Sequence, residues 1–281
     1  MKGHSVAKTW FITGTSSGFG RLLTERLLAH GDRVAATVRK SQALADLKAQ
    51  YGDRLWIASL EMTDSDAIRA TIDKAFGELG QIDVIVSNAG YGLFGAAEEL
   101  EDSQIRDLID TNLIGSIQLI RAVLPHLRKQ GGGRILQVSS EGGQMAYPGF
   151  SLYHATKWGI EGFVESVRQE VAPFGIGLTL VEPGPTQTNF GASLITSEPA
   201  DTYKDTPVGE LRRAFSEGSF DIKGDPNKMV EAMIASVEQD PAPRRLTFGA
   251  AAYASIHGAL AGRLRELENQ KDAALAMDIA P

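Results

Sequence analysis

The segment TWFITGTSSGFG, residues Thr9–Gly20, decides the fold of this chain. Its first five residues, Thr9–Thr13, are mostly apolar and predict a buried strand. Glycines follow, and a helix is predicted from about Gly18 to His30. A strand, a glycine turn and a helix N-terminus form an anion site, because backbone N–H groups and the helix dipole point at a phosphate that the missing Cβ atoms allow to approach. The spacing is GxxxGxG rather than the GxGxxG of the common dinucleotide fingerprint, and glycines also serve plain turns.

Six residues of this loop are expected to contact a dinucleotide: Gly14, Ser16, Ser17, Gly18, Phe19 and Gly20. The second predicted strand, Arg33–Val38, ends where NAD-binding folds usually hold the ribose 2′-hydroxyl with a carboxylate. Here Val38 is followed by Arg39 and Lys40. No acid repels a 2′-phosphate there, and Arg39 can bind one through two hydrogen bonds. This pattern favours NADP(H), with NAD(H) as the other possibility, although both cations could also be ordinary solvated charges.

Beyond the loop, short apolar runs alternate with longer amphipathic stretches. Further strands are predicted at Leu55–Ser59, Ile82–Ser87, Arg134–Ser139, Gly177–Glu182 and Arg245–Phe248, and helices near 64–79, 102–129, 152–173 and 227–239. Apolar strands with helical crossovers are typical of a parallel sheet covered on both faces. We therefore predict an α/β fold, a single doubly wound Rossmann-type domain over residues 1–281 with a central parallel sheet of about seven strands flanked by helices. Pro125 should bend or break the helix at 102–129.

Two late segments depart from this alternation. Residues 183–226 are punctuated by Gly, Pro, Ser and Asp, with one short helix expected near Val208–Phe215. They could be a lid over the ligand crevice or a surface insertion. Residues 252–276 are rich in Ala, Leu, Arg and Glu and predict a terminal helix, which could serve assembly or close the pocket.

The bulk composition argues against several classes of function. The 281 residues are 43% hydrophobic and 22% charged, as in ordinary globular proteins. A net charge of −7 gives no reason to expect nucleic-acid or membrane binding. The chain has no cysteine, which excludes disulfides and thiolate chemistry. With no signal-peptide pattern and no apolar run long enough to span a bilayer, a cytoplasmic protein is expected. The histidines show no metal-ligand spacing, so no metal site is expected.

Four polar side chains are candidates for chemistry. Tyr153 and Lys157 are four residues apart in a predicted helix and should share one face. A phenol with a pKa of about 10 is a poor base at neutral pH, and a nearby ammonium should lower that pKa. Ser140 follows the end of a strand, where α/β folds place ligand-binding groups, although serines there also form turns. Asn112 lies in an apolar helical stretch and needs a partner if buried, which is more often structural than catalytic.

Taken in order, these motifs resemble the short-chain dehydrogenases/reductases over about Thr9–Thr188. The matching motifs are TGxxxGxG at Thr13–Gly20, NAG at Asn88–Gly90, the asparagine Asn112, the serine Ser140, YxxxK at Tyr153–Lys157 and PGxxxT at Pro183–Thr188. The resemblance implies that Tyr153 is the acid/base and that Lys157 lowers its pKa and binds the nicotinamide ribose. It also implies that Ser140 orients the substrate oxygen and that Asn112 holds a water linking Lys157 to solvent.

The same resemblance implies a wider set of cofactor contacts: Glu61, Met62, Asn88, Ala89, Gly90, Tyr153, Lys157, Pro183, Gly184, Thr186 and Thr188. Glu61 departs from the aspartate common at its position. The implied activity is that of an NAD(P)(H)-dependent oxidoreductase interconverting a ketone or aldehyde and an alcohol. One alternative is a non-catalytic dinucleotide-binding sensor or scaffold, which would usually lose one of the catalytic groups. Another is a nucleotide-sugar epimerase or dehydratase, which typically shows TGxxGxxG and a larger substrate domain.

The expected partner is a small carbonyl or alcohol substrate of apolar or aromatic character. This follows from the residues expected to line the pocket, unless they are packing groups: Tyr91, Phe94, Met145, Tyr147, Phe150 and Phe190. His154 is expected to face away from the catalytic side of Tyr153. By analogy with the family, the helices at 102–129 and 152–173 would form the faces of a homodimer or homotetramer.

Overall fold

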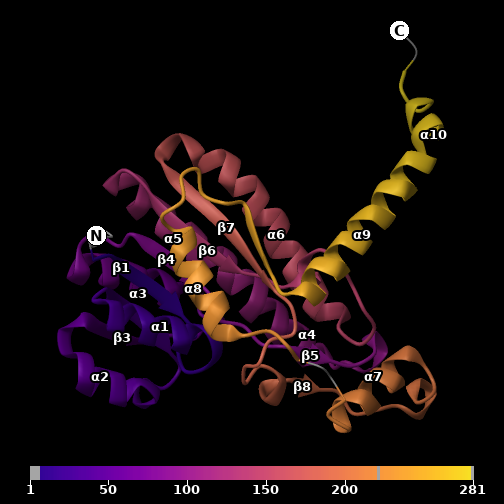
Figure 1. The fold of residues 1–281 in the computed structure, drawn as a ribbon, viewed down its shortest axis with the longest axis horizontal. Coiled ribbons are helices and arrows are strands. Elements are labelled where there is room, and N and C mark those ends of the chain that lie inside the picture. The colour runs from indigo at the N-terminus through magenta and orange to yellow at the C-terminus, as the bar shows by residue number, and fades with distance from the viewer. Residues whose placement is uncertain (1–6, 220–221, 280–281) are drawn as a thin grey trace.

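Seven parallel strands form the central sheet, in the order β3-β2-β1-β4-β6-β7-β9 (Figure 1). This computed structural model describes residues 7–219 and 222–279. The strands are β1 Thr9–Thr13, β2 Arg33–Val38, β3 Leu55–Ser59, β4 Val84–Ser87, β6 Gly133–Val138, β7 Ile176–Pro183 and β9 Arg245–Phe248. The order reverses between β1 and β4, so a crevice opens at their carboxyl ends, the usual ligand position in such sheets. The predicted doubly wound parallel sheet is confirmed.

The helices are α1 Gly18–His30, α2 Ala45–Tyr51, α3 Ser65–Leu79, α4 Asp102–Ile109, α5 Gly115–Gln130, α6 Ser151–Val171, α7 Pro207–Ser216, α8 Pro226–Ser236, α9 Ala250–Asn269 and α10 Lys271–Leu275. Residues of α3, α5 and α6 pack on one face of the sheet, and residues of α1, α2 and α8 on the other. Successive side chains of β1 point to opposite faces of the sheet, so they pack in two different hydrophobic clusters. Phe11 packs in the cluster that includes residues of α3, α5 and α6, whereas Trp10 and Ile12 pack in the cluster that includes residues of α1, α2 and α8. All three are at most 1% exposed, so β1 is buried from both sides.

The helix predicted at 102–129 is interrupted, but not by Pro125. A single π-helical turn at Asp110–Ile114 separates α4 from α5, and Pro125 lies inside the continuous α5. The turn carries the buried Asn112, and insertions of this kind often occur at functional sites. Pro125 therefore does not break the helix, and a bend there stays a prediction. The interruption at Asp110–Ile114 was missed, because the position of a π turn leaves no clear trace in the hydrophobic pattern.

The two ends of the segment 183–226 lie next to each other. Thr186 forms a parallel bridge with Gly224, and the Gln187 N–H donates to the Gly224 carbonyl at 3.0 Å. Within it, β8 (Ile195–Thr196) pairs with β5 (Leu93–Phe94), a small sheet that the sequence did not predict. The short helix α7 is found where it was expected, and its Val208 packs with Phe94 and Phe150. The segment, called the cover below, therefore packs on the body through β8 and α7.

Candidate active site

The glycine loop between β1 and α1 is shaped to receive an anion. Gly14 and Gly18 have φ of +70° and +55°, a region that favours glycine. A Cβ atom on Gly20 would lie 2.3 Å from the Gly14 carbonyl oxygen. No acidic residue lies in the first turn of α1, and Ser17 at its N-cap makes no side-chain capping bond. The loop therefore fits a pyrophosphate at the positive end of the helix.

Asn88 fastens this loop to the end of β4. Its amide Nδ2 donates to the carbonyls of Thr13 at 2.9 Å and Gly14 at 3.1 Å. In return, the Thr13 hydroxyl accepts from the backbone N–H groups of Asn88 and Ala89 at 3.0 and 3.1 Å. The Asn88 side chain is thus committed to the loop, while the backbone of Ala89 and Gly90 continues along the crevice edge.

The predicted adenosine-side residues lie at the ends of β2 and β3. Arg39 directly follows β2 and is exposed, and its carbonyl accepts from the Ser59 hydroxyl at 3.0 Å. Glu61 is exposed and its carboxylate accepts from the Met62 N–H at 2.9 Å, while Met62 is buried. A Cβ on Gly115 would lie 2.5 Å from the Met62 carbonyl, so α5 approaches this strand end closely.

Tyr153, Lys157 and Ser140 meet at the carboxyl end of β6. Tyr153 and Lys157 are one turn apart on α6 and each is 7% exposed, with the lysine Nζ 5.6 Å from the centroid of the phenol ring. The Lys157 ammonium donates to the carbonyl of Val138, the last residue of β6, at 3.1 Å. The Ser140 hydroxyl accepts from the Gly142 N–H at 3.1 Å, and it lies close enough to the Tyr153 phenol to lower the pKa of that phenol. The three groups predicted to share a site therefore do so.

Burial controls the ionisation of this pair. Burial raises the pKa of Tyr153 to about 12, the Ser140 hydroxyl opposes the rise, and the charge of Glu141 adds to it. Burial also lowers the pKa of Lys157 to about 8, against the opposing effect of Glu161. Burial therefore dominates the pKa of Tyr153, and the expected lowering of that pKa by Lys157 stays a prediction. At neutral pH the phenol holds its proton.

Asn112 is 2% exposed, and both ends of its side-chain amide bond the backbone of Tyr91. Oδ1 accepts from the Tyr91 N–H at 3.0 Å and Nδ2 donates to the Tyr91 carbonyl at 2.8 Å. A Cβ on Gly90 would lie 3.1 Å from Oδ1, so a glycine is needed for this approach. The π turn thus holds the segment that follows β4. A water relay through Asn112 stays a prediction.

The residues after β7 turn back on themselves. Gly184 donates its N–H to the Phe248 carbonyl at 3.0 Å, which ties the end of β7 to β9. The Thr186 hydroxyl donates to the Gly184 carbonyl at 2.7 Å, and the Thr188 hydroxyl accepts from the Phe190 N–H at 3.3 Å. Pro183 ends β7, so this segment starts at the same sheet edge as Ser140.

Aromatic side chains surround Tyr153. The Phe190 ring of the cover lies 5.9 Å from the Tyr153 ring, and Phe150 lies 6.1 Å from it on another side. Phe94 and Tyr147 are 5.2 and 5.3 Å from Phe150, so these predicted lining residues also pack against one another. The phenol ring therefore has aromatic neighbours in addition to the polar groups Ser140 and Lys157.

His154 supports the loop after Ser140. Its Nδ1 lies 2.9 Å from the Gly142 carbonyl and its Nε2 accepts from the Tyr147 N–H at 3.2 Å. Burial lowers the pKa of His154, which matches a neutral ring with its proton on Nδ1. This contact was not apparent from the sequence, which only separated His154 from the catalytic side of Tyr153.

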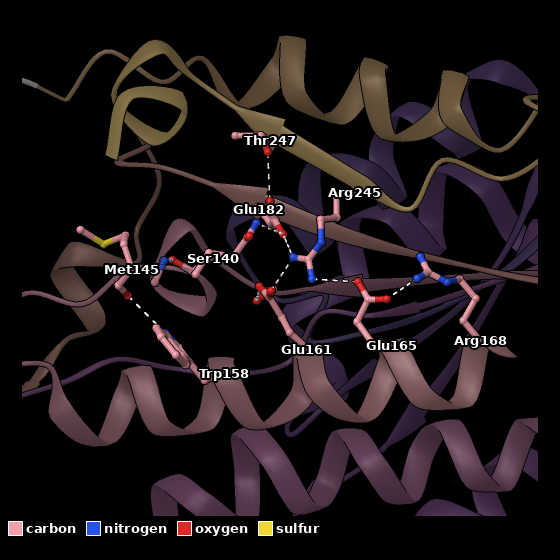
Figure 2. A network of polar contacts seen from close by, with 12 residues as sticks. Ser140, Met145, Trp158, Glu161, Glu165, Arg168, Glu182, Arg245 and Thr247 are labelled. Carbon is pink, nitrogen blue, oxygen red and sulfur yellow. Dashed lines mark hydrogen bonds and ion pairs between the residues drawn. The ribbon is translucent and has the colours of Figure 1, made fainter. Parts of the chain in front are cut away.

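Figure 2 shows an ion cluster next to the loop that follows Ser140, which sequence reasoning missed. Arg245 of β9 donates to Glu161 of α6 at 2.5 Å, and also to Glu182 of β7 and to Glu165. Glu161 accepts from the Ser139 hydroxyl at 2.6 Å. Gln144 and Thr247 donate to the two oxygens of Glu182 at 2.8 and 3.0 Å.

The cluster joins the strand end before Ser140 to the helix that carries Lys157. The available signal was a charge inside each apolar pattern: Glu161 four residues after Lys157, Glu182 at the end of a buried strand and Arg245 at the start of another.

Residues 7–219 and 222–279 contain neither a metal-binding cluster nor a membrane-spanning helix. No group of three His, Asp or Glu side chains there could hold a metal ion. None of the helices described there is long and apolar enough to cross a membrane.

Comparison with known proteins matches this architecture to one family. The family model for short chain dehydrogenase matches residues 8–199. The oxidoreductase BOA17 of Botryotinia fuckeliana is 35% identical over 246 residues, covering 87% of this chain and 89% of that protein. The crystal structure of a short-chain dehydrogenase from Streptomyces avermitilis superposes with a TM-score of 0.90 at 38% identity, covering 97% of this chain and all of that one.

An alcohol dehydrogenase from Thermococcus sibiricus, solved with 5-hydroxy-NADP, superposes with a TM-score of 0.69 at 25% identity and covers 86% of this chain and 95% of that one. The chain belongs to the short chain dehydrogenase family and is an NAD(P)-dependent oxidoreductase acting on CH–OH groups or the corresponding carbonyls.

Proposed function

We propose that the chain reduces the carbonyl group of a small apolar or aromatic ketone or aldehyde with NADPH, with Tyr153 as the proton donor. The observation that carries this proposal is the burial of the Tyr153 phenol beside Ser140 and one helical turn from Lys157, because this burial raises the phenol pKa and keeps its proton in place. Reduction needs a proton at the carbonyl oxygen, and a phenol with a pKa of about 12 still holds one at neutral pH. The aromatic neighbours of Tyr153 favour a substrate of similar character.

Each residue of the site has a role in this proposal. The Ser140 hydroxyl orients the substrate oxygen toward the Tyr153 phenol, and Tyr153 transfers its proton to that oxygen. Lys157 binds the ribose hydroxyls, and Asn112 keeps the neighbouring segment in place and holds the water that returns a proton to Lys157. The nicotinamide supplies the hydride when it is bound. Closure of the cover around Phe190 would exclude water from the reacting carbon.

The cofactor is proposed to lie along the carboxyl ends of β1, β2 and β4. The glycine loop would hold the pyrophosphate, and Glu61 and Met62 would border the adenine. The segment from Pro183 to Thr188 would contact the nicotinamide half. Exposed Arg39 at the end of β2 supports NADPH over NADH, since it can pair with a 2′-phosphate. NADP in the related alcohol dehydrogenase structure is consistent with this choice.

Assembly and compartment remain proposals from the sequence: a homodimer or homotetramer, acting in the cytoplasm. A screen of ketones, aldehydes and alcohols, followed by nicotinamide absorbance with NADPH and NADH in parallel, tests the function. We expect NADPH consumption with apolar ketones and slower rates with NADH. Tight NADPH binding with no consumption on any carbonyl would favour the sensor or scaffold instead.

A further inference from the structure

The helices α9 and α10 leave the body of the protein after a well-anchored start (Figure 1). Ala252 and Ile256 are buried against the body. Arg263 donates to the Gln144 carbonyl at 2.8 Å, with its guanidinium 4.8 Å from the Trp158 ring centroid. From Arg263 to Ile279 every residue is exposed. We call the segment 260–275 the arm; its direction is fixed by these anchoring contacts.

The arm carries a row of large apolar side chains that face water. Leu260, Leu264 and Leu267 are 46%, 55% and 64% exposed, and Tyr253 before them is 66% exposed. Steps of seven, four and three residues place all four on one side of α9. A row at this spacing is the usual contact line between two packed helices. One helix alone in water has nothing to bury this row against.

The charges of the arm argue against a lipid surface. Its charged side chains are the basic Arg263, Arg265 and Lys271 and the acidic Glu266, Glu268 and Asp272. This balance leaves no net positive charge to attract anionic lipid headgroups. The occupant that the arm fits is therefore a protein helix with a matching charge order.

Residues 263–268 have the sequence Arg-Leu-Arg-Glu-Leu-Glu. Read in the opposite direction, this sequence has a glutamate wherever the original has an arginine, an arginine wherever it has a glutamate, and a leucine at both leucine positions. Consider two antiparallel copies of α9 related by a two-fold axis between positions 265 and 266. Leu264 then faces Leu267 of the second copy. On one flank Arg263 lies beside Glu266 of the second copy, and on the other flank Arg265 lies beside Glu268 of the second copy. A two-fold interface requires this kind of self-complementarity, because each residue pair occurs twice.

We propose that the arm is a self-association surface, on which α9 of a second copy of this chain packs in the antiparallel direction. The proposal is independent of the catalytic function and of any interface that α4, α5 or α6 forms. Pairing through the arm would double the number of copies in any assembly that the rest of the chain forms.

A charge exchange tests the pairing. The mass of the full chain is measured by light scattering for wild type, Arg265→Glu, Glu268→Arg and the double variant Arg265→Glu/Glu268→Arg. Each single change places like charges side by side and should weaken assembly, and the double change should restore it. Leu264→Glu/Leu267→Glu should halve the mass of the assembly. Arg69→Glu on α3, an exposed arginine distant in the chain, is the matched control and should leave the mass unchanged.

Cross-linking gives an independent readout, because the natural chain has no cysteine. Leu264→Cys should form a covalent dimer with a short bismaleimide, and Asp66→Cys on α3 should not. Helix content by circular dichroism shows that each variant is folded. An unchanged mass in the double-leucine variant, or a double charge variant no better than the singles, would overturn the proposal. So would capture of the wild type by anionic vesicles that depends on Leu264.

Discussion

Replacing Arg245 by methionine perturbs the ion cluster next to the loop that follows Ser140. Arg245 is the cation shared by Glu161 and Glu182, whose side chains are 5% and 0% exposed. Methionine keeps an apolar stem of similar length but leaves both carboxylates without this partner. Removing one partner of a buried ion pair costs about 3–5 kcal/mol, because the remaining charge is uncompensated. Arg245 is itself 29% exposed, so solvent screens part of the loss and we expect the lower end, about 3 kcal/mol.

The assay is thermal unfolding. For a chain of this size, 1 kcal/mol shifts Tm by about 2 °C, so Arg245→Met should melt about 6 °C below the wild type near neutral pH. The matched control is Arg244→Met, which removes the exposed arginine next in sequence and should change stability by less than about 0.5 kcal/mol.

The amount by which Arg245→Met lowers the Tm should depend on pH. Burial already raises the pKa of Glu161, and Arg245 opposes the rise. Without Arg245 the folded-state pKa of Glu161 moves further above its unfolded value of about 4.3. The free energy of unfolding then falls as pH increases from that unfolded value through the folded one, because folding must desolvate an ionised carboxylate. The Tm deficit should be larger at about pH 8 than at about pH 5. A Tm equal to that of the wild type, or a deficit independent of pH, would refute this reasoning.

Three further predictions concern the cofactor loop and the phenol. Arg39→Asp should lower the NADPH to NADH ratio of kcat/KM at least about tenfold, since a charged hydrogen bond contributes about 1.5–3 kcal/mol; an unchanged ratio would remove Arg39 from the cofactor site. Gly20→Ala places a Cβ 2.3 Å from the Gly14 carbonyl, so it should destabilise the loop by about 1–3 kcal/mol and weaken NADPH binding in a fluorescence titration. An unaltered Kd would contradict the close packing of the loop. Alcohol oxidation needs the ionised phenol, so with a Tyr153 pKa of about 12 its rate should still be rising at about pH 10. A plateau below about pH 8 would show that the phenol ionises earlier.

Local patterns predicted the sheet well. Buried parallel strands appear in the sequence as continuous apolar runs, as in β1 and β2. These two strands and the edge strands β3 and β9 begin and end at the predicted residues. The π turn at Asp110–Ile114 and the small sheet of β5 and β8 were missed. A two-residue strand has too few positions to show a period, and its pairing depends on where the cover returns.

The sequence predicted which residues make up the candidate site, but not the effect of burial on their pKa values. The four-residue spacing brought Tyr153 and Lys157 together, and the order of the strands brought Ser140 to them. The direction of the Tyr153 pKa depends on how much water reaches the phenol, which spacing alone does not show. Glu161 and Arg245 are 84 positions apart in the chain, so their pairing follows only from the tertiary arrangement of α6 and β9.

Turnover of Tyr153→Phe tests the central claim most directly. This change removes one oxygen from a buried side chain and leaves the glycine loop and Arg39 untouched. We predict that NADPH binds with an unchanged Kd while kcat for carbonyl reduction falls by about 10²–10⁴, the usual contribution of a positioned proton donor. A variant that keeps kcat within a few-fold of the wild type would mean that the proton comes from another group, and the proposed mechanism would be wrong.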